Sequence, residues 1–226
     1  VKSSGNTVTV SAAFNNANSV DIQAGKLSLT GTGSSPAGSS ILVSGATATL
    51  DIASSFQSDG SIGGSNVIFT LISGETVTVN GSYIVTGLTQ KTGTGGTVTF
   101  ANPSTSLGNS FQLDQGGTVN LVSGSTHTIP SVTISAGTLA GTDTVAITGQ
   151  FTWSGGTLSG PSSITTSGTT SLSTTANKFL TNRTWTNNGT ADLPGGAIVF
   201  NNSAALINSA SGTISINSTH SMPISN

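Results

Sequence analysis

The chain has 226 residues, of which only 5% are charged, whereas an average soluble domain has about 25%, and its formal net charge is −2. Five Lys and Arg cannot form the basic surface that nucleic acid requires, and a single Glu is incompatible with a charged helical bundle. The low net charge, combined with abundant Val, Ile and Thr, also excludes a charge-driven disordered chain. The chain has no Cys, and no apolar run is long enough to cross a membrane as a helix.

The dominant element is a short strand unit in which a Gly precedes alternating polar and apolar residues. It first occurs at residues 5–10 (Gly-Asn-Thr-Val-Thr-Val), and we expect residues 1–13 to act as a capping or subunit-joining strand. The alternation has a period of 2, which predicts β-strands, and no segment shows the 3.6-residue period of a helix. The unit recurs at residues 25–29, 45–50, 74–79, 96–100 and 117–121, in shorter form at 137–139 and 156–158, and again at 212–216.

The spacing of these units predicts a single β-solenoid over residues 1–226. Most steps between their glycines are near 20 residues, which suits one solenoid coil. The predicted fold is therefore all-β, a right-handed parallel β-helix of roughly 9–10 coils of about 20 residues. A β-sandwich would need Asn-Gly or Asp-Gly turns at the strand spacing, and the few present do not follow the repeat. The longer step from Gly45 to Gly74 predicts a bulging coil around residues 56–66.

Stacking like residues over like residues gives the predicted inner and outer surfaces. Neighbouring coils lie about 4.8 Å apart, so each outward side chain stacks on its copy, and a repeated Lys or Glu would repel itself along the rod. Thr, Ser and Asn have no such penalty, which explains the low charge. One predicted inner ladder contains Leu27, Ala48, Val77, Val98, Val119, Leu139 and Leu158, and a second contains Leu29, Leu50, Val79, Phe100 and Leu121. Between them, a predicted outward Thr ladder contains Thr47, Thr49, Thr76, Thr78, Thr97, Thr99 and Thr118.

Two segments carry a resemblance to known proteins: residues 151–160 (Phe-Thr-Trp-Ser-Gly-Gly-Thr-Leu-Ser-Gly) and residues 24–31 (Ala-Gly-Lys-Leu-Ser-Leu-Thr-Gly). They resemble large secreted bacterial β-solenoid proteins, which are Gly/Thr-rich surface proteins, adhesins and autotransporter passengers. The resemblance covers about residues 14–170, and we expect residues 171–226 to form less regular coils. It implies an architecture and a location at the cell surface, but no activity. The chain lacks an initiator Met and a signal sequence at its start, so we expect a mature or excised part of a larger protein.

No group of residues has the spacing of a catalytic or metal site, and we expect no catalytic residue, metal ion or cofactor. Polysaccharide hydrolysis needs two carboxylates about 5–10 Å apart, whereas Asp51 and Asp143 share a phase of the repeat but lie several coils apart. His127, which we expect to face outward, and His220 are distant in sequence, and no calcium or phosphate-binding loop is present. Five Asn-x-Ser/Thr sequons are expected by chance in a chain so rich in these residues.

Two sets of side chains are candidates for contacts along the side of the rod. The outward Thr ladder has the regular hydroxyl array found in ice-binding solenoids. Its alternative explanation is that Thr suits exposed strand positions because it is β-branched and polar. Trp185, with its neighbour Arg183, and Trp153 are candidates for contact with a surface glycan, although single aromatic residues in solenoids more often fill corners.

The two ends of the rod are candidates for a subunit interface. The first and last coils of a solenoid expose unpaired strand edges, and neither end of this sequence has an obvious polar capping helix. The candidate interface residues are Val8 and Val10 at one end and Met222 and Ile224 at the other. We expect these ends to be covered by neighbouring subunits, head to tail, or by further repeats of a longer chain.

These features favour a non-enzymatic extracellular structural protein: a subunit or segment of a surface fibre, filament or stalk that is joined end to end through its solenoid edges. The expected partners are copies of itself or further repeats, with surface glycans as a further candidate. We expect no nucleic-acid partner and no membrane insertion. The alternatives are an adhesin or carbohydrate-binding module and an ice-binding solenoid, while the separation of the acids disfavours a polysaccharide-cleaving enzyme.

Overall fold

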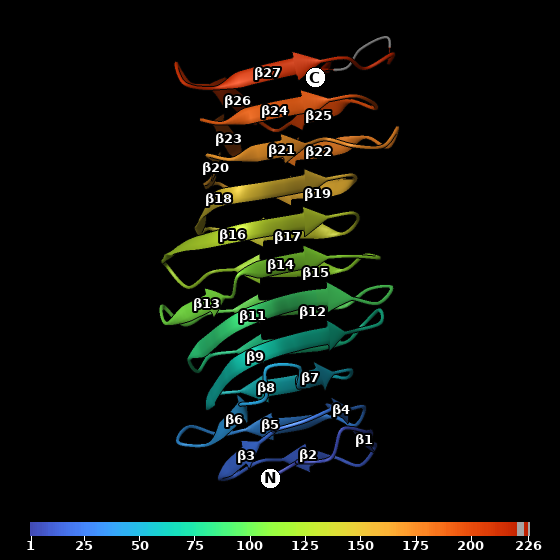
Figure 1. Cartoon of the computed structure of the whole chain (residues 1–226), viewed down its shortest axis with the longest axis vertical. Coiled ribbons are helices and arrows are strands. Elements are labelled where there is room, and N and C mark those ends of the chain that lie inside the picture. The colour runs from blue at the N-terminus through green and yellow to red at the C-terminus, as the bar shows by residue number, and fades with distance from the viewer. Residues whose placement is uncertain (221–223, 226) are drawn as a thin grey trace.

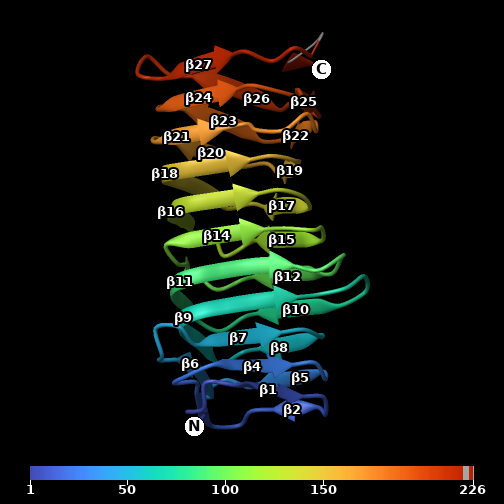
Figure 2. The ribbon, with the colours of Figure 1, turned by 45° about the vertical axis from the view of Figure 1, so that its right-hand side comes forward.

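The computed structural model describes residues 1–220 and 224–225, and these residues form a parallel β-solenoid. The N-terminal and C-terminal parts of the chain lie at opposite ends of the stack of coils (Figure 1). One coil takes 21 residues in the middle of the rod, where Thr76 pairs with Thr97 and Thr97 pairs with Thr118. The strands nearest the viewer in Figure 2 run from left to right as the chain climbs, so the coil is right-handed. The predicted all-β, right-handed parallel β-helix is confirmed. No helix that is long and apolar enough to span a membrane occurs in the described part of the chain.

Each coil has three sides, and we name the three stacks of strands face 1, face 2 and face 3. Faces 1 and 2 belong to one 17-stranded sheet, because four long strands bend from one face to the other, and face 3 is an 11-stranded sheet. Face 1 contains β3 (Ser19–Asp21), β6 (Ser40–Val43), the first halves of β9 (Ser61–Thr70) and β11 (Tyr83–Thr92), β13 (Thr105–Leu107), the first halves of β16 (Thr126–Ile134) and β18 (Thr144–Trp153), β20 (Ser163–Thr166), β23 (Thr184–Asn187) and β26 (Ala205–Asn208).

Faces 2 and 3 complete each coil. Face 2 contains β1 (Thr7–Val10), β4 (Lys26–Leu29), β7 (Thr49–Ile52), the second halves of β9, β11, β16 and β18, together with β14 (Ser110–Leu113), β21 (Thr169–Ser171), β24 (Thr190–Leu193) and β27 (Thr213–Ile216). Face 3 contains β2 (Phe14–Asn15), β5 (Gly33–Ser35), β8 (Phe56–Ser58), β10 (Thr76–Val79), β12 (Thr97–Phe100), β15 (Thr118–Leu121), β17 (Thr138–Gly141), β19 (Gly156–Ser159), β22 (Lys178–Thr181), β25 (Ile198–Asn201) and β28 (Ile224–Ser225).

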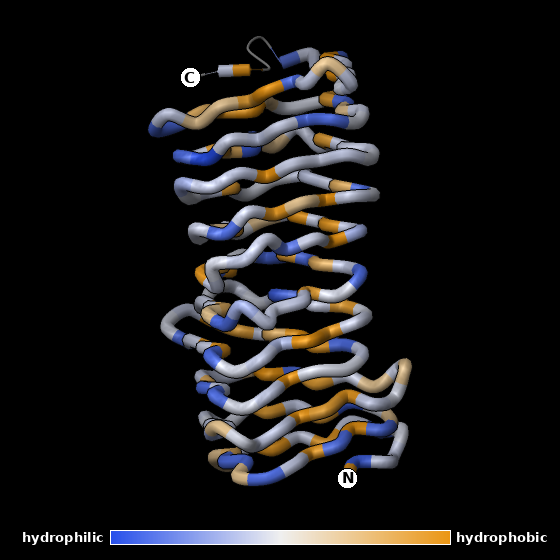
Figure 3. Tube along the Cα trace, turned by 90° about the vertical axis from the view of Figure 1, so that its left-hand side faces the viewer, coloured by the Kyte–Doolittle hydropathy of each residue, from blue (hydrophilic) through white to orange (hydrophobic). Residues whose placement is uncertain are grey.

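The interior of the rod is an apolar column built from one residue in two of each strand. On face 3 the inner ladder Val77, Val98, Val119, Leu139 and Leu158 stacks residue on residue, as predicted. Hydrophobic segments recur in the coils along the height of the stack (Figure 3). Each buried aliphatic side chain contributes about 1.5–3 kcal/mol by leaving water, but only when the next coil covers it, so the coils stabilise one another.

The predicted inner ladders are wrong at their N-terminal members. Leu27 pairs with Leu50 and not with Ala48, and Leu29 pairs with Ile52. The reason is that the units at residues 25–29 and 45–50 lie on face 2, whereas the units between residues 74 and 158 lie on face 3, and the last unit, at residues 212–216, lies on face 2 again. The long step from Gly45 to Gly74 therefore crosses from one face to another, and the predicted bulging coil around residues 56–66 does not form: residues 56–58 are the ordinary face 3 strand β8.

Aromatic side chains form two clusters in the interior. Phe69, Tyr83 and Phe100 form one cluster, with ring centroids 4.7–6.2 Å apart. Trp153 lies against Phe151 and contacts the edge of Trp185 in a second cluster. These large buried rings fill space between the three faces and contribute to close packing of the interior.

Glycines stack at the corner where the chain turns from face 1 to face 2. A Cβ on Gly168 would lie 2.0 Å from the carbonyl oxygen of Gly149, and a Cβ on Gly189 would lie 2.0 Å from that of Gly168. These distances are far below van der Waals contact, so no larger residue fits without moving the backbone of one coil away from the next. The glycines here are required by the closeness of adjacent coils.

Candidate functional site

Face 3 carries an unbroken column of Thr residues on its outer surface. In this Thr column, Thr76, Thr97, Thr118, Thr138 and Thr157 stack in register over five coils. A second, adjacent column contains Thr78, Thr99, Asn120 and Ala140. The predicted members from Thr76 to Thr118 therefore do share one face, and Thr138 and Thr157 extend the first column beyond the prediction.

Thr47 and Thr49 do not belong to these columns, and this part of the predicted Thr ladder is wrong. Thr49 lies in β7 on face 2, where it stacks between Lys26 and Asn66. Thr47 lies in the turn before β7. The alternation of Thr with an apolar residue is the same on both faces, so the pattern alone does not separate them.

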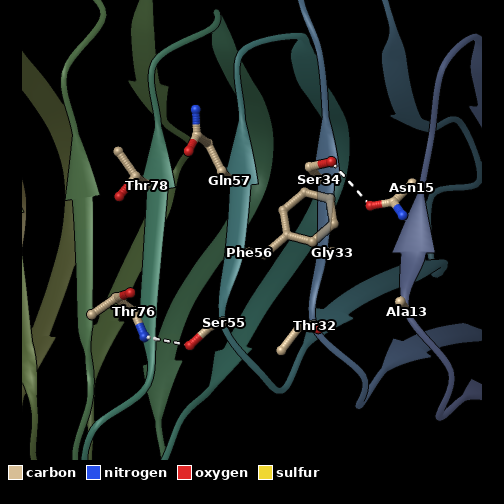
Figure 4. Close-up of a pocket in the computed structure, with 10 residues that line it drawn as sticks. All are labelled: Ala13, Asn15, Thr32, Gly33, Ser34, Ser55, Phe56, Gln57, Thr76 and Thr78. Carbon is tan, nitrogen blue, oxygen red and sulfur yellow. Dashed lines mark hydrogen bonds between the residues drawn. The ribbon is translucent and has the colours of Figure 1, made fainter.

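A shallow, open depression lies at the N-terminal end of face 3, where β2, β5, β8 and β10 meet (Figure 4). Most of its side chains form two rows, the ring of Phe56 lies between these rows, and none of the lining residues is charged. Ser34 Oγ donates to Asn15 Oδ1 at 3.0 Å, and the Thr76 backbone N–H donates to Ser55 Oγ at 3.1 Å. These bonds link neighbouring coils, so part of the polar surface is already satisfied by the protein. The rows are Ala13, Thr32, Ser55 and Thr76, and Asn15, Ser34, Gln57 and Thr78.

The predicted glycan contact at Trp185, Arg183 and Trp153 is wrong, because all three side chains are buried in the interior. Trp185 occupies an inward position of β23, and its Nε1 donates to Thr166 Oγ1 at 3.0 Å. Arg183 Nη2 donates to the carbonyl oxygen of Gly141 at 2.8 Å, two coils below. These side chains pack and form hydrogen bonds in the interior, where a ligand on the surface cannot contact them.

A buried polar cluster, formed by Ser123, His127 and Asp143, lies at the corner between faces 3 and 1. The Asp143 carboxylate accepts four hydrogen bonds: from the backbone N–H groups of Ser123 and Gly124, from Ser123 Oγ at 2.7 Å, and from His127 Nε2 at 2.9 Å. Ser123 donates its hydroxyl to the carboxylate and all three side chains are buried, so the cluster fastens the turn after β15 to the next coil. The expectation that His127 faces outward is wrong.

The electrostatics of this cluster favour an ionised Asp143. Burial, the largest single effect, raises the pKa of Asp143, but the hydrogen bonds from Ser123, His127 and the two backbone N–H groups together outweigh it. The pKa therefore lies below its ordinary value of 3.8. The same carboxylate interacts electrostatically with the buried Arg183. Burial lowers the pKa of Arg183 to about 10, and the negative charge of Asp143 partly opposes that change.

Asp143→Asn is expected to lower the free energy of unfolding at neutral pH by about 2–3 kcal/mol, because an amide cannot accept all four hydrogen bonds. The folded-state pKa lies below the unfolded one, so the carboxylate stabilises the fold above pH 3.8 and loses that effect as the pH falls through its folded pKa. Urea titrations of parent and variant over this range should show the difference shrink in acid. Asp192→Asn, at an exposed position, is the control; a difference independent of pH would contradict the account.

The two ends of the rod expose residues that occupy interior positions elsewhere. Val8 is 43% exposed and Ile224 is 44% exposed, while Val10 is partly buried. Ile216 in the last strand of face 2 is 45% exposed. Met222, the fourth predicted interface residue, lies outside the described residues. In the part of the chain that the structure describes, the apolar column is thus open to solvent at both ends.

Among the described residues, no group of His, Asp and Glu is arranged to hold a metal ion. The fold defines the class: a parallel β-solenoid with strands rich in Thr and Ser. Comparison with known proteins adds no narrower identity, since no protein family, no curated protein and no solved structure matches the chain.

Proposed function

We propose that this chain is a non-enzymatic structural rod, a subunit or segment of an extracellular fibre or stalk that continues end to end. The observation that carries the proposal is the open apolar column at both ends. On face 2, Val8 is 43% exposed, whereas Leu27 in the next coil is 6% exposed at the same inner position. Covering such positions is what stabilises each coil inside the rod, so a further coil at each end would stabilise the terminal coils in the same way.

The placement of charge supports a rod with neutral sides. Of the five Lys and Arg residues, Lys91, Lys178 and Arg183 are buried in the interior. The outer surface is therefore supplied mainly by hydroxyl and amide groups, which stack along the rod without repulsion. A secreted location and a likeness to bacterial surface proteins and adhesins belong to this proposal, and the sequence resemblance supports them.

Assembly in solution tests this proposal. Sedimentation velocity of the purified chain should show a growing series of species as its concentration rises. Ile216→Lys places a charge on the exposed end and should abolish the series without unfolding the chain. Thr133→Lys, on the outer surface of the middle of face 2, is the matched control and should leave the series intact. A parent chain that stays monomeric at every concentration would overturn the proposal.

The Thr column of face 3 favours a second candidate function, binding to ice. Its hydroxyl groups repeat about every 4.8 Å over five coils, and the five strands that carry them, β10, β12, β15, β17 and β19, contain no charged residue. An ordered hydroxyl array of this kind can hold surface water in a regular arrangement that matches the lattice of an ice crystal.

Thermal hysteresis measures this second candidate directly. Ice binding predicts a gap between the melting and freezing points of a solution of the purified chain. Thr97→Lys would remove the gap by placing a charge in the Thr column, whereas Thr133→Lys on face 2 would leave it unchanged. The absence of hysteresis at millimolar concentration would exclude ice binding and leave the structural proposal untouched.

A further inference from the structure

We infer that two copies of this chain join through face 2, with β27 of one copy pairing in parallel with β1 of the next, so that Thr213 lies opposite Thr7 and Ile216 opposite Val10. The inference rests on the proposed end-to-end rod and names its partner, a second copy, and its register. Across the joint, the parallel strand pairing of face 2 therefore continues from one copy into the next.

Both strands offer edges that can accept a partner. Among the described residues β1 pairs with β4 and β27 pairs with β24, which leaves the outer edge of each strand without a partner strand. Their sequences, Thr-Val-Thr-Val and Thr-Ile-Ser-Ile, contain no Pro and no charged residue. Proteins that avoid association normally protect such edges with charged residues, Pro or bulges. These two edges have neither a charged residue nor Pro.

The side chains of the two strands match in only one phase. Val8 and Val10 continue the inner positions of Leu27 and Leu29, and Ile214 and Ile216 continue those of Ala191 and Leu193. Pairing Ile214 with Val8 and Ile216 with Val10 buries all four and places hydroxyl side chains opposite hydroxyl side chains on the outside. A shift by one residue would turn the apolar side chains of one copy toward water. A shift by two residues would keep them inward but would leave only one apolar pair instead of two, so the pattern favours the stated register.

The register proposed for face 2 also continues face 1. The backbone of Lys2 forms an isolated parallel β-bridge with that of Ile22 at the start of the rod, and Asn208 pairs with Asn187 at the other end. Lys2 precedes Thr7 by five residues, and Asn208 precedes Thr213 by five residues, so the pairing on face 2 brings Lys2 over Asn208. A joint in this register therefore continues two faces at once with no insertion in either copy.

The polar groups at this second contact are complementary. Lys2 Nζ donates to the carbonyl oxygens of Ser4 and Ala24, and an ammonium group has a third N–H. Asn208 Oδ1 accepts one hydrogen bond, from Asn187 Nδ2 at 2.9 Å, and an amide oxygen can accept two. In the proposed joint, a residue with a donor to spare at one end therefore lies opposite a residue with an acceptor to spare at the other. Such a contact between different surfaces does not close on itself, so it generates an open fibre.

Disulfide trapping tests the register, and the absence of native Cys makes it free of background. The double variant Thr7→Cys with Thr213→Cys places the two Cα atoms about 4.8 Å apart across the joint, within the range of a disulfide. The double variant Thr9→Cys with Thr213→Cys moves one Cys by two residues, which is beyond that range. After mild oxidation at assembling concentrations, the first variant should give a ladder of covalent oligomers on a denaturing gel, and the second should lose it.

The outcomes separate this joint from the rod proposal. A ladder from the first variant alone supports the register. Assembly of the first variant without a ladder, or equal ladders from both variants, overturns the register but leaves the proposed end-to-end rod standing. A parent chain that never assembles overturns the rod proposal and the joint together.

Discussion

Replacing Gly168 with Ala is expected to lower the free energy of unfolding by about 2–4 kcal/mol, the cost of forcing atoms into a packed region. The new Cβ would lie 2.0 Å from the carbonyl oxygen of Gly149 in the coil below. Both groups belong to backbone, so neither can rotate away as a flexible side chain would. The coils must separate at this corner, which weakens the hydrogen bonds on both sides of it.

Urea denaturation followed by circular dichroism measures this effect, with Gly5→Ala as the matched control. Gly5 is exposed, and nothing lies within 4 Å of where its Cβ would be, so its replacement should change stability by no more than about 0.5 kcal/mol. Equal stability of the two variants would show that the coils are not packed as closely at this corner as described.

Trp185→Ala is expected to lower the free energy of unfolding by about 3–5 kcal/mol, because it removes a fully buried ring and leaves a cavity. The change also removes the hydrogen bond to Thr166 Oγ1 and the edge contact with Trp153. Neighbouring coils are fixed by their strand ladders and cannot collapse fully into the space. The loss therefore belongs to the upper part of the range for core aromatic residues.

Phe179→Ala is the control for this variant. Phe179 lies on the outer surface of face 3, where it is 37% exposed, so its loss should cost about 1 kcal/mol or less. Thermal unfolding of both variants measures the contrast. If Trp185→Ala were as stable as the parent chain but bound a surface glycan less well, Trp185 would be a ligand contact and the buried arrangement would be wrong.

Much of the fold could be predicted because a solenoid repeats its own signal. Period-2 alternation with a step near 20 residues identifies strands and coil length, and the ladder from Val77 to Leu158 follows directly. The assignment of units to faces could not be predicted in the same way. A unit such as residues 45–50 has the same alternation as the unit at 96–100, although one lies on face 2 and the other on face 3. Only the pairing of distant coils separates them.

The polar interior was the harder part to predict. Alternation places His127 on the same side as Ile129, which is inward, so a signal for its burial was present in the sequence. Its partner Asp143 gave no such signal, because it lies in a turn and reaches His127 only through the stacking of coils. Lys91 and Arg183 break the expectation that charged residues face water. Lys91 Nζ and Arg183 Nη2 donate to backbone carbonyl oxygens of other coils, and the sequence does not reveal such contacts.

Electron microscopy of the purified chain at rising concentration tests the central claim, a rod that continues through its ends. A single chain stacks roughly ten coils at about 4.8 Å each, giving a rod of about 50 Å. The account predicts unbranched fibres one solenoid wide that lengthen with concentration and are absent from the Ile216→Lys variant. Isolated rods of a single chain length at every concentration would contradict it.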